Sequence, residues 1–181
     1  MFLDAGNVIL RPFIESDRDI LVTRILTNEQ IMERALTERA LEEDDAHRFI
    51  ATYFNVKFPE LGFATVAIKN NDRAIGFAGY RSCRYLDAPD VEFGWLIDTD
   101  YQGRGYATAV GEKLILHGLF CLNLNRVLAA CNPDNVASDR VLRHKLNMTF
   151  HTVVTTEDGH KRNVFVAAPS WRPPVRPAQT G

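Results

Sequence analysis

The stretch "DTDYQGRGYATAVGEKLILHGLF", Asp98 to Phe120, runs from a loop rich in glycine and arginine directly into an amphipathic helix. Gly103 and Gly105 let the backbone turn its N–H groups toward one point. The start of a helix adds about four unpaired N–H groups and a partial positive charge. Such a loop can bind an anion, and Arg104 can add a full charge. A loop that only needs positive φ angles would carry the same glycines, so this pattern alone leaves both interpretations open.

Two common phosphate-binding motifs do not fit this stretch. A P-loop requires the spacing GxxxxGK[ST], which the sequence lacks. A dinucleotide-binding loop requires GxGxxG near the first strand and an acidic residue about twenty positions later. Here Thr108 stands where the third glycine belongs, and the loop comes late in the chain. The spacing therefore argues against both nucleotide-binding motifs.

The composition is that of a globular protein with a sizeable core. The chain has 181 residues, of which 46% are hydrophobic and 24% charged, a size typical of one domain. Its net charge of −2 gives no general attraction to nucleic acid, so any anion site must be local. The three cysteines lack CxxC spacing, which argues against a disulfide framework or a zinc site. With no apolar run long enough to span a membrane and no basic secretory signal, we expect a cytoplasmic protein.

Hydrophobic periodicity and turn residues predict the order of the elements. They predict a strand at Asn7–Arg11, helices at 16–28, 28–36 and Leu41–Asn55, a hairpin at 62–83, a strand at Asp90–Ile97, a helix at Arg104–Cys121, a strand at Arg126–Cys131, a helix at Asn135–Leu146 and a hairpin at 149–168. Early helices, an antiparallel meander and a final β-α-β-α-β order are typical of an α+β fold. We expect a single domain over 1–168, followed by a proline-rich disordered tail over 169–181.

The motif Gln102-Gly103-Arg104-Gly105-Tyr106-Ala107 resembles the Q/R-x-x-G-x-G/A coenzyme A motif of the GNAT acyltransferase superfamily. The segments "VILRPFIESD", "VEFGWLIDTDYQGRGYAT" and "NPDNVASDRVL" are similar to its RimJ/RimL-type branch of N-acetyltransferases. The resemblance covers roughly Asn7 to Ala168. It implies a GNAT fold: a central mixed, mostly antiparallel sheet flanked by helices, with two strands splayed at the acetyl-CoA site. It also implies acetyl transfer from acetyl-CoA to a primary amine.

The resemblance further implies which residues bind acetyl-CoA. The pantetheine arm would pair with the backbone of one strand, as an added strand does. The implied cofactor-binding residues are Trp95, Leu96, Ile97, Gln102, Gly103, Arg104, Gly105, Tyr106, Ala107, Thr108 and Asn135. For Trp95 and Leu96 the alternative is core packing, and for Asn135 it is capping of the following helix.

In this family the amine attacks the thioester directly, without a covalent intermediate or a metal. Glu92 is then the candidate general base, acting through a water, because a partly buried carboxylate has a raised pKa. Backbone N–H groups near Trp95 and Leu96 would polarise the thioester carbonyl. Ser138 would protonate the departing thiolate, which needs little help because its pKa is about 8.5. A solvent-facing Glu92, or a reaction without any side-chain base, is the alternative.

The sequence departs from the branch at the end of the last helix. Where relatives have "VLEKLGM", this chain has "VLRHKLNM", with one extra residue and Asn147 in place of glycine. Asparagine tolerates the left-handed conformation of a C-terminal cap, and the extra residue predicts a bulge between Ser138 and Asn147.

The identity of the acceptor does not follow from the resemblance, because the branch serves many acceptors. The amine would be a protein N-terminus or a small molecule. Relatives are often dimers, so a homodimer remains open. The alternative from another class is a non-catalytic module that binds acyl-CoA as a sensor or scaffold.

Overall fold

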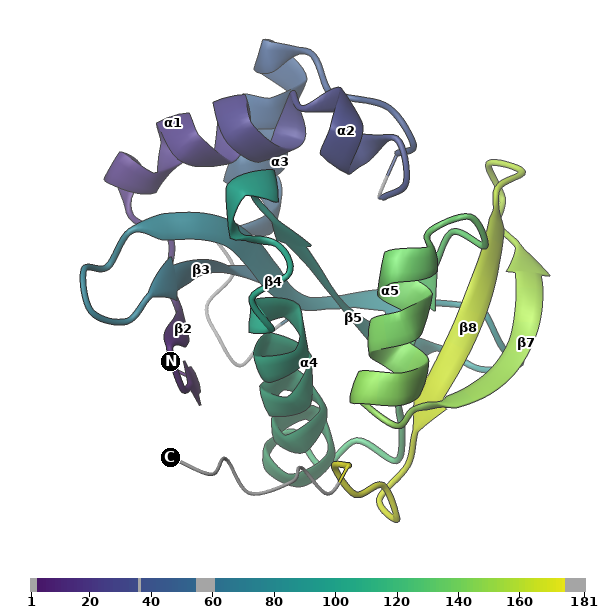
Figure 1. Ribbon diagram of the computed structural model, residues 1–181. Helices are drawn as coiled ribbons and strands as arrows, with labels where there is room; N and C mark the ends of the chain where they lie inside the picture. Colours follow the sequence, from purple (N-terminus) through teal and green to yellow (C-terminus); the bar gives the residue numbers. More distant parts are fainter. Residues whose placement is uncertain (1–2, 36, 55–60, 175–181) are drawn as a thin grey trace.

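The computed structural model describes residues 3–35, 37–54 and 61–174, in which eight strands form one sheet of order β1-β2-β3-β4-β5-β6-β8-β7. The strands are β1 (Leu3–Ala5), β2 (Val8–Arg11), β3 (Phe63–Ile68), β4 (Ala74–Cys83), β5 (Asp90–Ile97), β6 (Val127–Cys131), β7 (Thr149–Thr155) and β8 (Lys161–Ala167). The helices are α1 (Arg18–Ile20), α2 (Glu29–Met32), α3 (Glu43–Tyr53), α4 (Tyr106–Leu116) and α5 (Val136–Arg140). Helices α1 to α3 gather above the sheet, and α4 and α5 cross in front of it (Figure 1).

The sheet is mixed and mostly antiparallel, which confirms the predicted fold class. All neighbouring strands run antiparallel except β5 and β6, which are parallel with Glu92 in register with Leu128. Two expectations need correction. Strand β1 was not predicted, and it forms a hairpin with β2 through Gly6 at φ +80°. The helix expected over 28–36 ends at Met32, and turns follow it.

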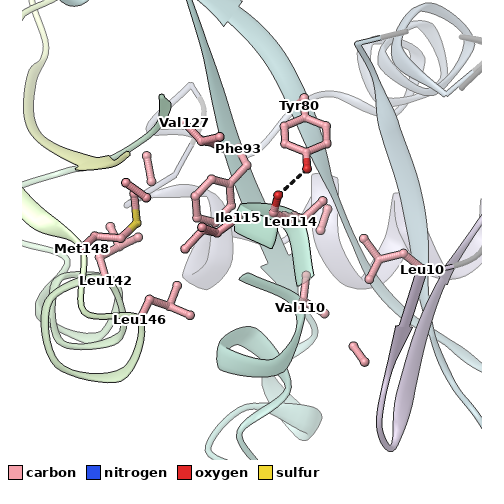
Figure 2. Close-up of a cluster of buried hydrophobic side chains, with 14 of the residues drawn as sticks. Leu10, Tyr80, Phe93, Val110, Leu114, Ile115, Val127, Leu142, Leu146 and Met148 are labelled. Atoms are coloured by element: carbon pink, nitrogen blue, oxygen red, sulfur yellow. Dashed lines mark hydrogen bonds between the residues drawn. The ribbon is translucent and has the colours of Figure 1, made fainter. Parts of the chain in front are cut away.

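Separate hydrophobic clusters cover the two faces of the sheet. On β4, Phe77 belongs to the cluster under α1 to α3, whereas Tyr80 belongs to the cluster under α4. Odd and even positions of a strand point to opposite faces, which explains this division. In the second cluster Phe93 packs near Leu114, whose carbonyl oxygen accepts a hydrogen bond from the Tyr80 hydroxyl (Figure 2).

The extra residue in the last helix produces the predicted bulge. Helix α5 continues as a π-helical turn over Val141–Lys145, in which the N–H of Leu146 donates to the carbonyl of Val141 at 2.8 Å. Asn147 follows at φ +51°, the left-handed conformation expected for the residue that replaces glycine.

The packed domain extends beyond Pro169, which corrects the expected start of the tail. Trp171 is only 7% exposed and belongs to the cluster under α4. Its indole N–H donates to the carbonyl oxygen of Leu146 at 2.6 Å, which closes the end of α5. Residues 175–181 of the expected tail lie outside the described residues.

A buried ion pair joins the first strand of the meander to the first helix. The Arg11 guanidinium donates two hydrogen bonds to the Asp17 carboxylate, at 2.6 and 2.8 Å, and the Thr65 hydroxyl donates a third at 2.9 Å. The two side chains are 6% and 3% exposed. Burial alone would raise the pKa of Asp17, but Arg11 and its other donors hold that pKa below its usual value. The pair therefore stabilises the fold above the unfolded-state pKa of Asp17 and loses that contribution as the pH falls.

We predict that Arg11→Leu destabilises the protein by about 3–5 kcal/mol, because it leaves the Asp17 carboxylate buried without its partner. Urea unfolding at pH 7 measures the loss, which should shrink at pH 3 as Asp17 becomes protonated. Arg18→Leu is the matched control, since Arg18 pairs with the exposed Glu15 and should lose far less. Equal losses for the two variants would contradict the assignment.

Candidate functional site

Two connected hollows lie where β5 and β6 diverge. The first, here called the groove, runs from the Tyr101–Thr108 segment to α5. The second, here called the cavity, lies between β4, β5, β6 and the start of α5 and reaches Glu92. Trp95, Leu96 and Ser138 line both, so the groove opens into the cavity at these residues.

The loop before α4 has the backbone conformation that its glycines predict. Gly103 and Gly105 have φ angles of +73° and +80°, and Gly105 directly precedes α4. No atom lies within 4 Å of a Cβ built on either glycine, so the conformation rather than space requires them. Side chains with a Cβ are strained at these angles. The N–H groups of the first turn of α4 remain available to a ligand.

A buried carboxylate anchors this loop. Asp98 accepts a hydrogen bond from the N–H of Asp100 at 3.0 Å and is bound by both ends of the Arg24 guanidinium, at 2.9 and 3.0 Å. Burial would raise the pKa of Asp98, but Arg24 and the backbone donor lower it. Gln102 turns its side chain inward and donates to the carbonyl of Ile97 at 2.8 Å. These contacts set the loop's position relative to the end of β5.

Most of the implied cofactor-binding residues line the groove together. They are Trp95, Leu96, Ile97, Gln102, Gly103, Gly105, Tyr106, Ala107, Thr108 and Asn135. Arg104 differs, because its guanidinium lies over the Tyr101 ring at 5.3 Å and donates to the carbonyl of Asp100 at 3.0 Å. In this conformation Arg104 contacts other residues of the loop and does not line the groove.

The open edge of β5 forms the floor of the groove. From Phe93 to Ile97 this strand pairs with β4, from Tyr80 to Gly76. Its register with β6 is at Glu92 and Leu128 alone within the described chain. Beyond Glu92, the main-chain groups on the β6 side have no strand partner in the described chain. The Ile97 carbonyl accepts from Gln102, and the others face whatever occupies the groove.

Glu92 lies at the point of divergence and is buried, with 6% of its side chain exposed. It pairs with Arg81, its cross-strand neighbour on β4, and accepts a hydrogen bond from the Tyr85 hydroxyl at 3.1 Å. Burial raises the pKa of Glu92, although Arg81 and Tyr85 oppose that rise. Burial, together with the charge of Glu92, also raises the pKa of Tyr85 to about 12. The alternative of a solvent-facing Glu92 is therefore wrong.

Asn135 and Ser138 stand at the start of α5, where the groove meets the cavity. The Asn135 carboxamide oxygen accepts a hydrogen bond from the N–H of Ser138 at 3.0 Å, so Asn135 does cap the helix. Its Nδ2 donates to the carbonyl of Arg34 at 3.1 Å. Asn135 therefore both caps α5 and lines the groove.

Comparison with known proteins agrees with this geometry. Residues 7–146 match the acetyltransferase (GNAT) domain. The chain belongs to the GNAT acetyltransferase family. It is 28% identical to the uncharacterized N-acetyltransferase YnaD of Bacillus subtilis over 146 residues, which cover 79% of this chain and 80% of YnaD.

Solved GNAT structures share its fold. A GNAT-family acetyltransferase from Bacillus anthracis superposes with a TM-score of 0.78 at 20% identity, covering 93% of this chain and 99% of that one. The ribosomal L7/L12 α-N-protein acetyltransferase RimL, in complex with coenzyme A, superposes with a TM-score of 0.74 at 16% identity, covering 93% and 98%. GNAT acetyltransferases use acetyl-CoA and transfer its acetyl group to an amine, and this chain is an acetyltransferase of that family.

Several charged residues of this GNAT site escaped the sequence analysis. Arg34, Arg81 and Arg162 line the cavity, and Arg140 and Lys145 line the groove. Only Arg81 could have been predicted from the sequence, because antiparallel pairing of the consecutive strands β4 and β5 places it opposite Glu92. The others are brought to the site by contacts between elements that are distant in sequence.

Glu38, in the segment after α2, is bonded to residues that border the cavity. The Glu38 carboxylate accepts a hydrogen bond from Asn132 at 2.9 Å and pairs with Arg162 and with His160, the latter at 2.5 Å. Burial would raise the pKa of Glu38, but Arg162 and Asn132 lower it. Arg34, four residues before Glu38, lines both the groove and the cavity.

Residues 3–35, 37–54 and 61–174 lack the features of a metal site and of a helical membrane span. No three His, Cys, Asp or Glu side chains in these ranges are grouped to hold a metal ion. None of the helices in these ranges is both long and apolar enough to cross a membrane.

We predict that Gly105→Val weakens acetyl-CoA binding at least about tenfold, or ~1.4 kcal/mol. A β-branched residue is strained at φ +80° and must move the N–H groups at the start of α4. Gly159→Val is the matched control, because Gly159 has φ +85° in the β7–β8 turn, away from the groove. Isothermal titration calorimetry measures both. Wild-type affinity in Gly105→Val, or an equal loss in Gly159→Val, would refute the role of this loop.

Proposed function

We propose that the groove binds acetyl-CoA with its thioester at Ser138 and that the cavity admits the acceptor amine from the Glu92 side. The observation that carries this proposal is the meeting of the two hollows at Trp95, Leu96 and Ser138. A direct transfer requires donor and acceptor to enter from different sides and to meet at one carbonyl carbon. The two joined hollows satisfy that requirement.

The donor is held mainly by backbone groups. The pyrophosphate accepts hydrogen bonds from N–H groups of the Gln102–Thr108 segment, where the helix dipole adds positive potential. The amides of pantetheine pair with the open edge of β5 over Trp95 to Ile97, as a peptide does when it extends a sheet. The main-chain groups exposed beyond Glu92 support this arrangement.

The chemistry follows from the groups around the junction. Glu92 accepts a proton from the acceptor ammonium through a water, which leaves the amine lone pair free to attack. A bond forms between the amine nitrogen and the carbonyl carbon, and N–H groups near Trp95 and Leu96 stabilise the oxygen that gains charge. The carbon–sulfur bond then breaks. The Ser138 hydroxyl gives the departing thiolate a proton and takes up, through water, the second proton that the attacking nitrogen loses as the amide forms. Glu92 then returns its proton to solvent.

The charge of the cavity wall narrows the choice of acceptor. Arg34, Arg81 and Arg162 line it, whereas Glu92 is the acidic residue among its described lining residues. Each of these arginines pairs with a glutamate, but a guanidinium keeps further N–H donors. A carboxylate on the acceptor can bind these donors, whereas a polycationic amine cannot. The acceptor is therefore a protein N-terminus or small amine that carries an acidic group. RimL, which acts on ribosomal protein L7/L12, supports the N-terminal choice.

Release of coenzyme A with a panel of amines tests this function. We expect amino acids and short peptides with acidic residues to react faster than polyamines or aminoglycosides. Faster reaction with polycations would refute the acceptor assignment. Silence across the panel, together with tight acetyl-CoA binding, would instead favour a non-catalytic sensor or scaffold.

Glu92→Gln should lower kcat/KM by about 10²–10⁴-fold at pH 7, because the variant cannot accept the amine proton. The raised pKa of Glu92 predicts that wild-type activity falls as the pH drops toward it and the carboxylate becomes protonated. The variant should recover as the pH approaches the pKa of the amine, since solvent then supplies the free base. A variant pH profile parallel to that of the wild type would remove Glu92 as the base.

Ser138→Ala should lower kcat by about tenfold at neutral pH while acetyl-CoA affinity stays within twofold or so. The deficit should shrink above pH 8.5 or so, where the thiolate leaves without a proton. Ser82→Ala, an exposed change on β4 outside both hollows, is the control. Unchanged kcat, or a loss confined to binding, would contradict a proton-donating role.

A further inference from the structure

Helix α5 and the π-helical turn that continues it place two cations, Arg140 and Lys145, on the wall of the groove. Within the π-helical turn, the hydrogen bond from the Leu146 N–H to the Val141 carbonyl spans five residues, one more than in an α-helix. Residues five apart therefore come close to one line, which brings Lys145 above Arg140. Both line the groove, whereas His144, the α-helical neighbour of Arg140, does not.

Arg140 and Lys145 are exposed and unpaired in the described part of the chain. The neighbouring acid, Asp139, is occupied, because it pairs with Arg143 at 3.1 Å. Glu33, on the opposite wall of the groove, pairs with Arg34 at 3.2 Å. The two cations thus have their charge available to a ligand.

Their position along α5 indicates which part of the ligand they meet. Arg140 and Lys145 follow Ser138 by two and seven residues, which corresponds to roughly 3 and 10 Å along a helix away from the start of α5. The thioester end lies at Ser138, and the N–H groups around Gly105 already serve the pyrophosphate. The cations therefore lie toward the adenosine end, at the open mouth of the groove. A phosphate monoester carries nearly two charges at pH 7 and, in exposed surroundings, is best held by cationic side chains.

We propose that Arg140 and Lys145 form a subsite for the 3′-phosphate of coenzyme A. The subsite makes the enzyme prefer coenzyme A over 3′-dephospho-coenzyme A. This inference rests on the proposed acetyl-CoA site but concerns different residues and a different part of the ligand.

Calorimetric titration of the whole protein with coenzyme A and with 3′-dephospho-coenzyme A tests the subsite. The wild type should bind coenzyme A about tenfold more tightly. Arg140→Gln and Lys145→Gln should each reduce that ratio about threefold to fivefold, as expected for an exposed charge pair. The double variant should bind both ligands with similar affinity. In every variant the affinity for the dephosphorylated ligand should stay at its wild-type value.

Lys161→Gln is the control for a general change of charge, because Lys161 lies on β8 outside the groove and should keep the wild-type ratio. Equal wild-type affinity for the two ligands would overturn the subsite. Variants that weaken both ligands by one factor would overturn it as well and would assign the cations to the pyrophosphate. Failure of the wild type to bind either ligand would refute the proposed acetyl-CoA site itself, a result distinct from these two.

Discussion

The brief parallel contact between β5 and β6 is the constraint on which the rest of the site depends. Glu92 and Leu128 are in register, and beyond them β5 continues beside β4 alone in the described chain. Unpaired main-chain groups are costly unless water or a ligand satisfies them. Strand β5 keeps its pairing with β4 up to Ile97, while β6 pairs on its other side with β8. The two strands thus separate after one register pair, and a ligand rich in amides can fill the gap between them.

The same point of divergence gives Glu92 its chemical character. A carboxylate buried without a partner would stay protonated at neutral pH, and one fully paired to an arginine would be a poor base. Glu92 lies between these limits, since burial raises its pKa while Arg81 and Tyr85 restrain the rise. Arg81 is itself partly exposed, with 45% of its side chain accessible, so solvent weakens its pull on the proton. The pKa of Glu92 is thus raised above that of an exposed glutamate, which makes its carboxylate a stronger base.

Features governed by local backbone rules were predictable from the sequence, and features that need distant contacts were not. The left-handed conformations of Gly103 and Gly105 follow from the residues themselves. The bulge before Asn147 follows from one extra residue relative to the family's usual pattern. The pairing of Glu38 with Arg162 joins positions 124 apart, and no local pattern predicts it. The burial of Trp171 was missed for another reason. The proline-rich composition of the C-terminal segment predicted disorder, whereas the Trp171 ring is packed in the core.

Helix α5 shows how a local irregularity can preserve a site. Its start is tied to Arg34 through Asn135, and its end is buried through Leu146, whose carbonyl accepts the Trp171 indole N–H. One extra residue in a regular α-helix would rotate Leu146 by about 100° out of the core. Exposing a leucine costs about 1.5–3 kcal/mol, whereas the π turn keeps the Leu146 N–H bonded to the Val141 carbonyl in a slightly wider ring. The insertion is therefore absorbed between two fixed ends, and the face that lines the groove keeps Ser138 at one end and Lys145 at the other.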